Sequence, residues 1–179
     1  MAHMYLMVGV SGAGKTTFSK KFAEEHGLLR LGIDDLYAKI NGDECKHVNT
    51  FDVWIEFFKA IHETEINDID CVIDTNALTW HQRMQFIEWF PTFTHHIIYI
   101  ETDHELCKKN NKSRKRQVPD DKMDRMIEEL EVPHPTLDTR WDSIIHVKNV
   151  NNQFYEPKYY GPVRVHKFDN NNQHDVIVR

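Results

Sequence analysis

The sequence contains few cysteines and no arrangement of them that would hold a metal. Its 179 residues include only three, Cys45, Cys71 and Cys107, which lie far apart and form no C-x-x-C pair. This pattern argues against a disulfide framework or a zinc site and is typical of a reducing compartment. The twelve histidines form no H-E-x-x-H motif, and His95 and His96 begin an apolar strand, where adjacent side chains point to opposite faces. We therefore expect no metal site built from histidine.

Long apolar runs are also missing. No apolar stretch approaches the roughly 18 residues of a membrane span, and we find no signal-peptide pattern. Residues 1–4 (MAHM) are typical of a cloning remnant, so we expect the natural chain to begin at Met4. These features together predict a cytoplasmic protein without a membrane partner.

The net charge of −6 argues against a protein that coats nucleic acid in general. The charge is unevenly placed, however, because residues 108–116 (KKNNKSRKR) contain six basic and no acidic residues. A concentrated cationic segment on an acidic body is expected to contact phosphate locally. The alternative is a solvated basic helix face or a localisation-like tract.

The most specific motif is GVSGAGKT at residues 9–16, which matches G-x-x-x-x-G-K-[ST]. It follows the apolar run 5–8 and precedes a segment, 17–26, with apolar residues at helical spacing, which is the strand–loop–helix context that the motif requires. Glycines let successive backbone N–H groups point at phosphate oxygens, and the helix dipole adds positive potential. We expect this loop to bind a nucleoside triphosphate through Gly9, Ser11, Gly12, Ala13, Gly14, Lys15, Thr16 and Thr17, with Thr16 as a Mg²⁺ ligand.

The alternation of strand and helix patterns predicts an α/β fold with a five-stranded parallel sheet and helices on both faces. The aromatic residues of the helix expected at 50–67, among them Trp54 and Phe58, are read as core rather than as a surface for stacking bases. The expected strands are 5–8, 28–33, 70–76, 96–101 and 143–147, and the expected helices are 17–26, one from about 36, 50–67, 79–90, 103–110 and 120–131.

Polar side chains follow two of the predicted strands. Asp34 and Asp35 come after the second strand, and Asp74, Thr75 and Asn76 end the third. Ligands of open α/β sheets bind at the carboxyl ends of the strands, so these residues are candidates for catalysis or for a Walker B carboxylate. Helix capping and turn formation remain the alternatives for each.

The C-terminal part has a different composition. Residues 150–179 are rich in Asn, Pro and Gly, and 162–168 alternates like a single strand. We expect residues 4–149 to form the catalytic domain and 150–179 to form an extension without a core of its own. Residues 166–179 are faintly similar to the opening of an HD-type phosphohydrolase domain, so the extension either packs on the first domain or begins a second one.

Four features in this order resemble the 5′-kinase domain of phage-type polynucleotide kinases, within the P-loop kinases that include zeta-toxin-like enzymes. They are the loop at 9–17, the pair 34–35, the D-T-N triplet at 74–76, and the basic stretch that runs into Val118-Pro119 before a Met-rich helix. The likeness covers about residues 4–147. It implies a P-loop kinase with a basic lid at about 108–118, ATP and Mg²⁺ as cofactors, and a single-stranded nucleic-acid 5′ end as acceptor.

The resemblance also assigns roles to residues. Asp34 would be the general base on the acceptor 5′-hydroxyl, and Asp74 would place the acceptor and a metal-bound water. Basic lid residues would clamp the transferred phosphoryl group. We therefore expect Lys15, Asp34 and Arg114 to be catalytic, Arg116 to bind the nucleotide, Thr16 and Asp74 to bind metal, and Asp35, Asp74, Thr75, Asn76, Arg83 and Lys109 to bind substrate.

Two positions depart from the family pattern. The family often has D-D-x-R, whose arginine contacts the acceptor phosphate, but Tyr37 stands at that position here. Counting back from Val118-Pro119, the usual lid arginine falls on Ser113, with Arg114 one place later. The acceptor need not carry the same phosphate as in the family.

Three functions are therefore compared. The first is ATP-dependent phosphorylation of a polynucleotide 5′-hydroxyl in nucleic-acid repair, and the second is phosphorylation of a small-molecule hydroxyl such as a nucleoside, nucleotide-sugar or antibiotic. The third, a nucleotide-binding switch, is disfavoured because Asp34 would have no role in it, and the sequence has no N-K-x-D guanine-reading motif.

Overall fold

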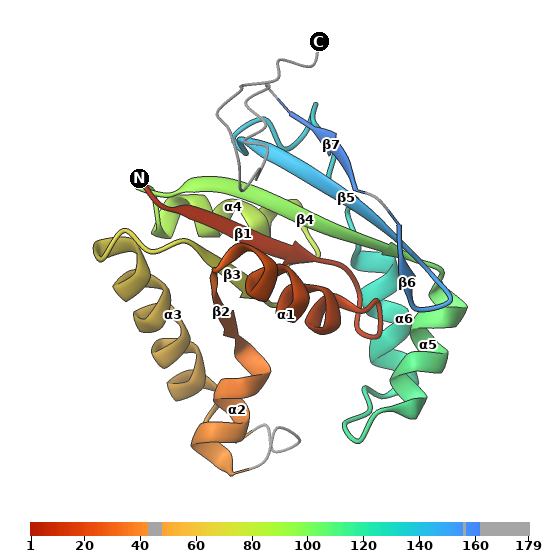
Figure 1. Cartoon of the computed structure of the whole chain (residues 1–179). Coiled ribbons are helices and arrows are strands. Elements are labelled where there is room, and N and C mark those ends of the chain that lie inside the picture. Colours follow the sequence, from red (N-terminus) through yellow and green to blue (C-terminus); the bar gives the residue numbers. More distant parts are fainter. Residues whose placement is uncertain (43–47, 156, 162–179) are drawn as a thin grey trace.

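The computed structural model describes residues 1–42, 48–155 and 157–161. Within them the chain forms an α/β structure around one twisted sheet (Figure 1). The strands are β1 (His3–Val8), β2 (Leu29–Gly32), β3 (Cys71–Asp74), β4 (Thr94–Thr102), β5 (Ser143–Val150), β6 (Gln153–Phe154) and β7 (Lys158–Tyr160), and the helices are α1 (Lys15–His26), α2 (Ile33–Asn41), α3 (Thr50–Ile66), α4 (Trp80–Trp89), α5 (His104–Ser113) and α6 (Asp120–Glu129).

The sheet has the order β2-β3-β1-β4-β5-β6, and β7 pairs with β5. The first five strands are parallel, which confirms the predicted fold class. β6 and β7 run antiparallel to β5 and extend the sheet to seven strands. The short segment after residue 150 therefore adds strands to the sheet of the preceding domain. The possible second domain at 166–179 lies outside the described residues.

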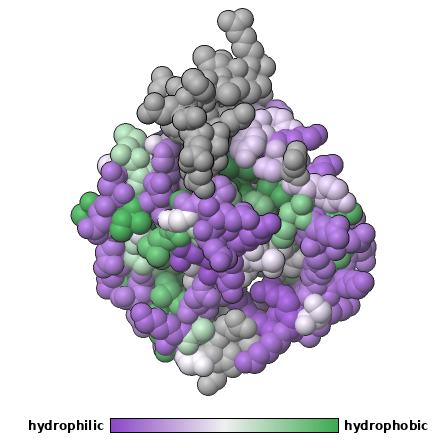
Figure 2. Space-filling view, in the orientation of Figure 1, coloured by the Kyte–Doolittle hydropathy of each residue, from purple (hydrophilic) through white to green (hydrophobic). Residues whose placement is uncertain are grey.

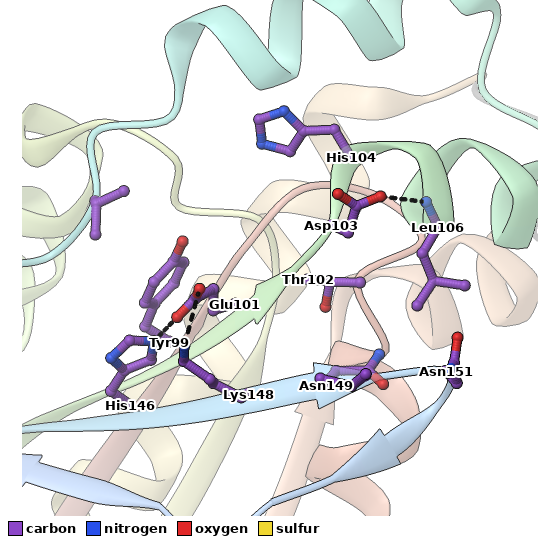
Figure 3. Close-up of a pocket in the computed structure, with 12 residues that line it drawn as sticks. Tyr99, Glu101, Thr102, Asp103, His104, Leu106, His146, Lys148, Asn149 and Asn151 are labelled. Carbon is purple, nitrogen blue, oxygen red and sulfur yellow. Dashed lines mark hydrogen bonds and ion pairs between the residues drawn. The ribbon is translucent and has the colours of Figure 1, made fainter.

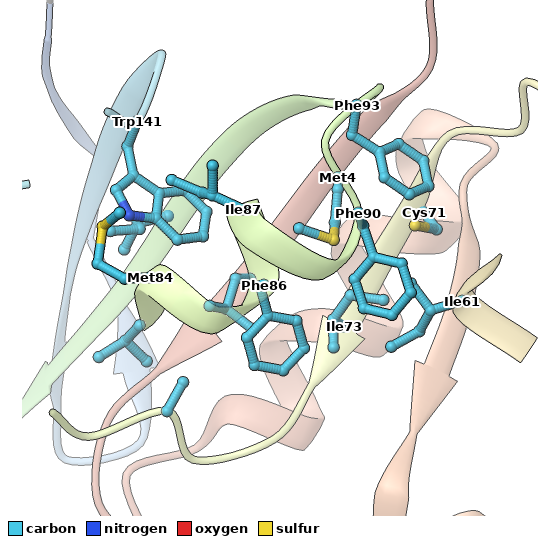
Figure 4. Close-up of a cluster of buried hydrophobic side chains, with 14 of the residues drawn as sticks. Met4, Ile61, Cys71, Ile73, Met84, Phe86, Ile87, Phe90, Phe93 and Trp141 are labelled. Carbon is cyan, nitrogen blue, oxygen red and sulfur yellow. The ribbon is translucent and has the colours of Figure 1, made fainter. Parts of the chain in front are cut away.

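The side chains of β1 point alternately to the two faces of the sheet, which explains why helices cover both of these faces. Met4, Leu6 and Val8 pack with residues of α3 and α4, while Tyr5 and Met7 pack with residues of α1 and α5. Successive side chains of a strand point to opposite faces, so each apolar strand needs a helical layer on either side. Figure 4 shows the first layer, in which Trp141 and the apolar side chains of α4 lie over the sheet. Figure 2 shows that hydrophilic residues cover most of one outer face.

Several boundaries differ from the sequence-based expectation. β1 begins at His3, and Ala2 is buried, so the MAHM segment contributes to the sheet. β2 ends at Gly32, which places Asp34 and Asp35 in the first turn of α2 rather than at the end of the strand. Acidic residues stabilise a helix N-terminus, which accounts for the earlier start. α5 continues to Ser113, so six of the nine residues of the basic segment are helical.

Side-chain caps lie at the start of α4 and α5, at the positions expected from the sequence. The Thr79 side chain accepts a hydrogen bond from the Gln82 backbone N–H, and the Gln82 side chain accepts one from the Thr79 backbone N–H. This reciprocal pair forms a capping box at the start of α4. Asp103 caps α5 by accepting from the backbone N–H groups of Glu105 and Leu106. No helix in the described part of the chain has the length and apolar character needed to cross a membrane.

Arg83 has a structural position, which corrects the substrate-binding role expected of it. Its side chain is 1% exposed and donates from Nε and Nη2 to the two carboxylate oxygens of Asp138, at 2.9 and 3.2 Å. Its Nη1 donates to the carbonyls of Leu78 and Glu131, at 3.0 and 2.9 Å. These bonds occupy the guanidinium and join α4 to two loops, residues 75–79 and 130–142, and little surface remains for a substrate.

We expect Asp138→Ala to lower the free energy of unfolding by about 3–5 kcal/mol, because it leaves the buried Arg83 charge without its partner. Urea denaturation would measure the loss. The control is Glu88→Ala, which removes an exposed pair with Arg140 at 3.8 Å and should cost less than about 1 kcal/mol. Equal effects of the two substitutions would contradict the structural role of Arg83.

Candidate nucleotide and acceptor site

The glycine-rich loop joins β1 to α1 and passes close to α5. Gly9, Gly12 and Gly14 have φ angles of 147°, 80° and 98°, which side chains disfavour. A Cβ at Gly12 would lie 2.2 Å from the backbone carbonyl oxygen of Cys107. Glycine at this position is therefore required by the close approach of two backbones, in addition to any contact with phosphate.

Side chains behind the loop hold its carbonyl groups. The carbonyl of Ala13 accepts hydrogen bonds from Thr102 Oγ1 at 2.8 Å and Asn149 Nδ2 at 2.9 Å. The carbonyl of Gly12 accepts from Asn110 Nδ2 at 2.9 Å, and Asn110 also bonds with Asn152. The Ala13 N–H in turn donates to the Val10 carbonyl at 3.2 Å, so hydrogen bonds within the protein fix the shape of the loop.

None of these supporting residues was identified from the sequence. The asparagines near residue 150 were interpreted as a loop signal alone. The cluster of Asn149, Asn151 and Asn152 after an apolar strand could have indicated a supporting role, because a buried amide needs hydrogen-bonding partners.

Lys15 lies buried under the loop. Its Nζ donates to the carbonyl of Val10 at 2.8 Å, and only 8% of the residue is exposed. Burial lowers the pKa of Lys15 to about 8; the carboxylate of Asp74 partly offsets this shift, while the charge of Arg114 adds to it. The ammonium group is thus less well solvated than that of a surface lysine, and an anionic ligand would stabilise its charged form.

A cavity of about 190 Å³ brings most of the predicted residues together. It lies at the carboxyl ends of the strands, as expected for an open α/β sheet. Apolar side chains, including Tyr37, Trp54 and Met126, form part of its wall. Among the predicted residues it is lined by Ser11, Lys15, Thr16, Asp34, Asp74, Thr75, Asn76, Arg114 and Arg116.

A second hollow of about 310 Å³ lies on the other side of Lys15. Gly12, Gly14 and Thr17 line it, together with the Asn110 and Asn152 pair. Lys15, Thr16 and Arg114 border both hollows. The loop therefore separates two spaces of different character, and only the first contains carboxylates.

Asp74 and Asp35 share one arginine that the sequence reasoning missed. Arg30, on β2, donates to Asp74 Oδ2 and Asp35 Oδ2, and its Nε donates to Ser19 Oγ at 2.9 Å. Burial acts to lower the Arg30 pKa, but the two carboxylates outweigh it and raise that pKa overall. The sequence feature that could have indicated this role is the position of Arg30 within an apolar strand, because a charged side chain requires a partner when it is buried.

A further ion pair at the cavity joins α2 to residues 114–116, which follow α5. Arg116 Nη1 donates to Asp34 Oδ1, and Arg114 Nη1 donates to Ser11 Oγ at 3.3 Å. Both arginines therefore reach the cavity from the basic segment. Lys109 instead lies exposed on α5 and lines neither hollow.

Thr16 and Asp74 are the residues that would hold Mg²⁺. Hydroxyl and carboxylate oxygens are suitable ligands, and both side chains border the cavity. Ser19 and Arg30 occupy Asp74 Oδ2, whereas Oδ1 has no hydrogen bond to another described residue. No group of three or more His, Cys, Asp or Glu in the described part of the chain could hold a metal ion, so phosphate and water oxygens would complete the coordination. The two residues fit such a partly hydrated ion.

A larger hollow, of about 780 Å³, lies elsewhere (Figure 3). It is formed by the ends of β4 and β5 and the start of α5. Its charged groups pair among themselves, since Glu101 bonds with His146 and lies 3.6 Å from Lys148. Thr102 and Asn149, which bond the Ala13 carbonyl of the loop, also border this hollow. It contains no residue of the glycine-rich loop, and we place the chemistry in the smaller cavity.

The comparisons with known proteins agree with this geometry. Residues 4–133 match a family model described as an AAA domain. The chain belongs to this family of P-loop kinases. No curated protein matches the sequence.

Solved structures of other P-loop kinases share the fold of this family member. A gluconokinase from Sinorhizobium meliloti 1021 has a TM-score of 0.57 at 18% identity, covering 82% of each chain. Kti12 from Chaetomium thermophilum with ADP-AlF3 has a TM-score of 0.63 at 14% identity, covering 81% of this chain and 88% of that one. A chain of the Pnkp1/Rnl/Hen1 RNA repair complex has a TM-score of 0.64 at 14% identity, covering 72% and 44%. At these identities the likeness shows the fold alone, so nucleotide binding and phosphoryl transfer follow from the family and the acceptor does not.

We expect ADP affinity to fall as pH rises above about 8, by up to tenfold per pH unit, because a bound polyphosphate favours the charged form of Lys15. Binding should then take up a proton. Calorimetry between pH 7.5 and 9.5 in buffers of different ionisation enthalpy would measure both effects. In Lys15→Arg the guanidinium stays charged, so the pH dependence of any remaining affinity should flatten. A pH-independent affinity in the unaltered protein would contradict the assignment.

Proposed function

We propose that this protein transfers the γ-phosphate of ATP to the 5′-hydroxyl end of a polynucleotide. The observation that carries the proposal is that one cavity joins the phosphate-binding Lys15 and Thr16 to the carboxylates Asp34 and Asp74, with two arginines between them. Phosphoryl transfer requires mainly alignment and charge stabilisation, which this set of groups supplies.

The acceptor oxygen would attack the γ-phosphorus while the bond from that phosphorus to the β-phosphate oxygen breaks and ADP leaves. The proton of the hydroxyl would pass to the carboxylate of Asp34. Lys15, Arg114 and Arg116 would stabilise the charge on the transferred group, and Asp74, Thr75 and Asn76 would orient the acceptor. Mg²⁺, held by Thr16 and Asp74, would neutralise charge on the β- and γ-phosphates.

The ion pair between Arg116 and Asp34 suggests an order of events. The guanidinium occupies a carboxylate oxygen of the proposed base. An incoming γ-phosphate would compete for the same guanidinium, because a phosphate group carries more charge than one carboxylate. ATP binding would thereby release Asp34 to accept the proton from the acceptor.

A second candidate is phosphorylation of a small-molecule hydroxyl. The small volume of the cavity, about 190 Å³, favours it, and the gluconokinase structure shows the same fold. The basic segment at residues 108–116 favours a polymer. Binding to a polyanion falls steeply with salt because counterions are released, whereas binding to a neutral metabolite does not.

The experiment measures transfer of γ-labelled phosphate from ATP, with Mg²⁺, to single-stranded DNA or RNA carrying a 5′-hydroxyl. Asp34→Asn should lower turnover by about 100-fold or more while ATP binding persists, because only the proton acceptor is lost. The matched control is Asp35→Asn, which removes the neighbouring carboxylate, 60% exposed and outside the cavity lining. We expect Asp35→Asn to keep most of the turnover.

Near-normal turnover of Asp34→Asn would overturn the base assignment and turn attention to Asp35. If the unaltered protein binds ATP and transfers phosphate to neither polymer, the polynucleotide proposal fails. A screen of small hydroxyl compounds would then test the second candidate.

A further inference from the structure

A hollow of about 460 Å³ lies next to the cavity around Asp34, and we call it the aromatic groove. α3, α4, α6 and residues 75–78 form its walls. The two spaces share Trp54, Thr75, Asn76 and Met126. The groove therefore lies next to the cavity, and an acceptor whose hydroxyl lies at Asp34 would reach it along these four side chains.

Three aromatic rings line one side of the groove. Trp54 lies 5.5 Å from Phe58, and Phe58 lies 4.9 Å from Trp89 in an edge-to-face contact. Trp89 is 46% exposed, whereas Trp54 and Phe58 are half-buried against the core. The aromatics of α3 were expected to be core alone; Phe57 is core, but Trp54 and Phe58 also offer surface to the groove. Rings held by packing on one side supply stacking area at little entropic cost.

The polar groups of the groove suit an uncharged ligand with hydrogen-bonding edges. Among the described residues that line it, Glu129 is the only charged one. The amides of Asn76 and Gln85 can donate and accept hydrogen bonds, while Gln82, whose Oε1 accepts from the Thr79 N–H, can still donate. A phosphodiester would meet no cation here and one anion, so phosphate is disfavoured. A planar ring with polar edges fits both the aromatic rings and the amides.

The backbone beside the shared residues is in an uncommon conformation. Ala77 follows Asn76 with φ of 43°, in the left-handed region, and is buried. Such a conformation persists where the surrounding structure holds it. Thr75 and Asn76, directly before it, line both the cavity and the groove.

We propose that the aromatic groove stacks the nucleobase of the acceptor's terminal nucleoside while the 5′-hydroxyl of that nucleoside lies at Asp34. This proposal rests on the polynucleotide kinase function proposed above. Stacking on aromatic rings is tolerant of sequence, because every base has a flat face, so any base would be accepted. The groove would thus align the terminal sugar without reading a sequence.

The test compares two 5′-hydroxyl oligonucleotides that differ only at the terminal residue, one with its base and one abasic. Loss of the base should lower kcat/KM at least about fivefold, mainly by raising KM, because a stacking contact on the acceptor is lost. Trp89→Ala should cause a similar loss with the complete oligonucleotide and little further loss with the abasic one. This non-additivity identifies a contact between ring and base.

The matched control is Trp80→Ala. Trp80 is also on α4 and 44% exposed, but it does not line the groove, and its Nε1 donates to the Leu137 carbonyl. We expect Trp80→Ala to leave the ratio between the two acceptors unchanged. The KM for ATP should stay constant in both variants.

Equal transfer to both acceptors, unaffected by Trp89→Ala, would overturn the groove assignment and leave the polynucleotide kinase function standing. A raised KM for ATP in Trp89→Ala would also overturn it, since the groove would then hold the donor base. Transfer to neither oligonucleotide by the unaltered protein would overturn the function and the groove together.

Discussion

The close packing of the glycine-rich loop on α5 is the constraint on which the rest of the site depends. A Cβ at Gly12 would meet the Cys107 carbonyl oxygen at 2.2 Å, and Thr102, Asn110 and Asn149 bind the carbonyls of the loop from behind. These bonds fix the shape of the loop at the edge of the cavity. Lys15 is buried at the same place, so its charge is available to a phosphate rather than dispersed in water.

Two arginines organise the carboxylates around this loop. Arg30 links Asp35 to Asp74 from β2, while Arg116 reaches Asp34 from the basic segment. Arg30 pairs with two carboxylates, of which that of Asp74 is only 6% exposed. The pair of Arg116 with Asp34 is more exposed and joins an element that a nucleotide would also contact. The same chemistry, an arginine beside an aspartate, therefore has a structural role in one place and a proposed catalytic role in the other.

The acceptor side combines a small polar cavity with an apolar groove. The cavity holds the charged groups that a phosphoryl group would meet, and the groove holds aromatic rings and amides. This separation of charge from stacking surface is what a nucleoside end requires, with a hydroxyl at one point and a base at another. In the hollow of about 780 Å³, Glu101 pairs with His146 and Lys148 instead, and the size of a hollow alone is a poor guide to function here.

The sequence by itself determined the parallel sheet, the phosphate loop and the group of residues 34, 74, 75 and 76, because strand periodicity and the loop motif are local patterns. Only the tertiary structure decided the partners of these residues. Arg83 belongs to Asp138 rather than to a substrate, Arg30 joins two carboxylates, and Trp54 faces both core and groove. These contacts join residues up to 55 positions apart, and no local pattern specifies which distant groups a long side chain will meet.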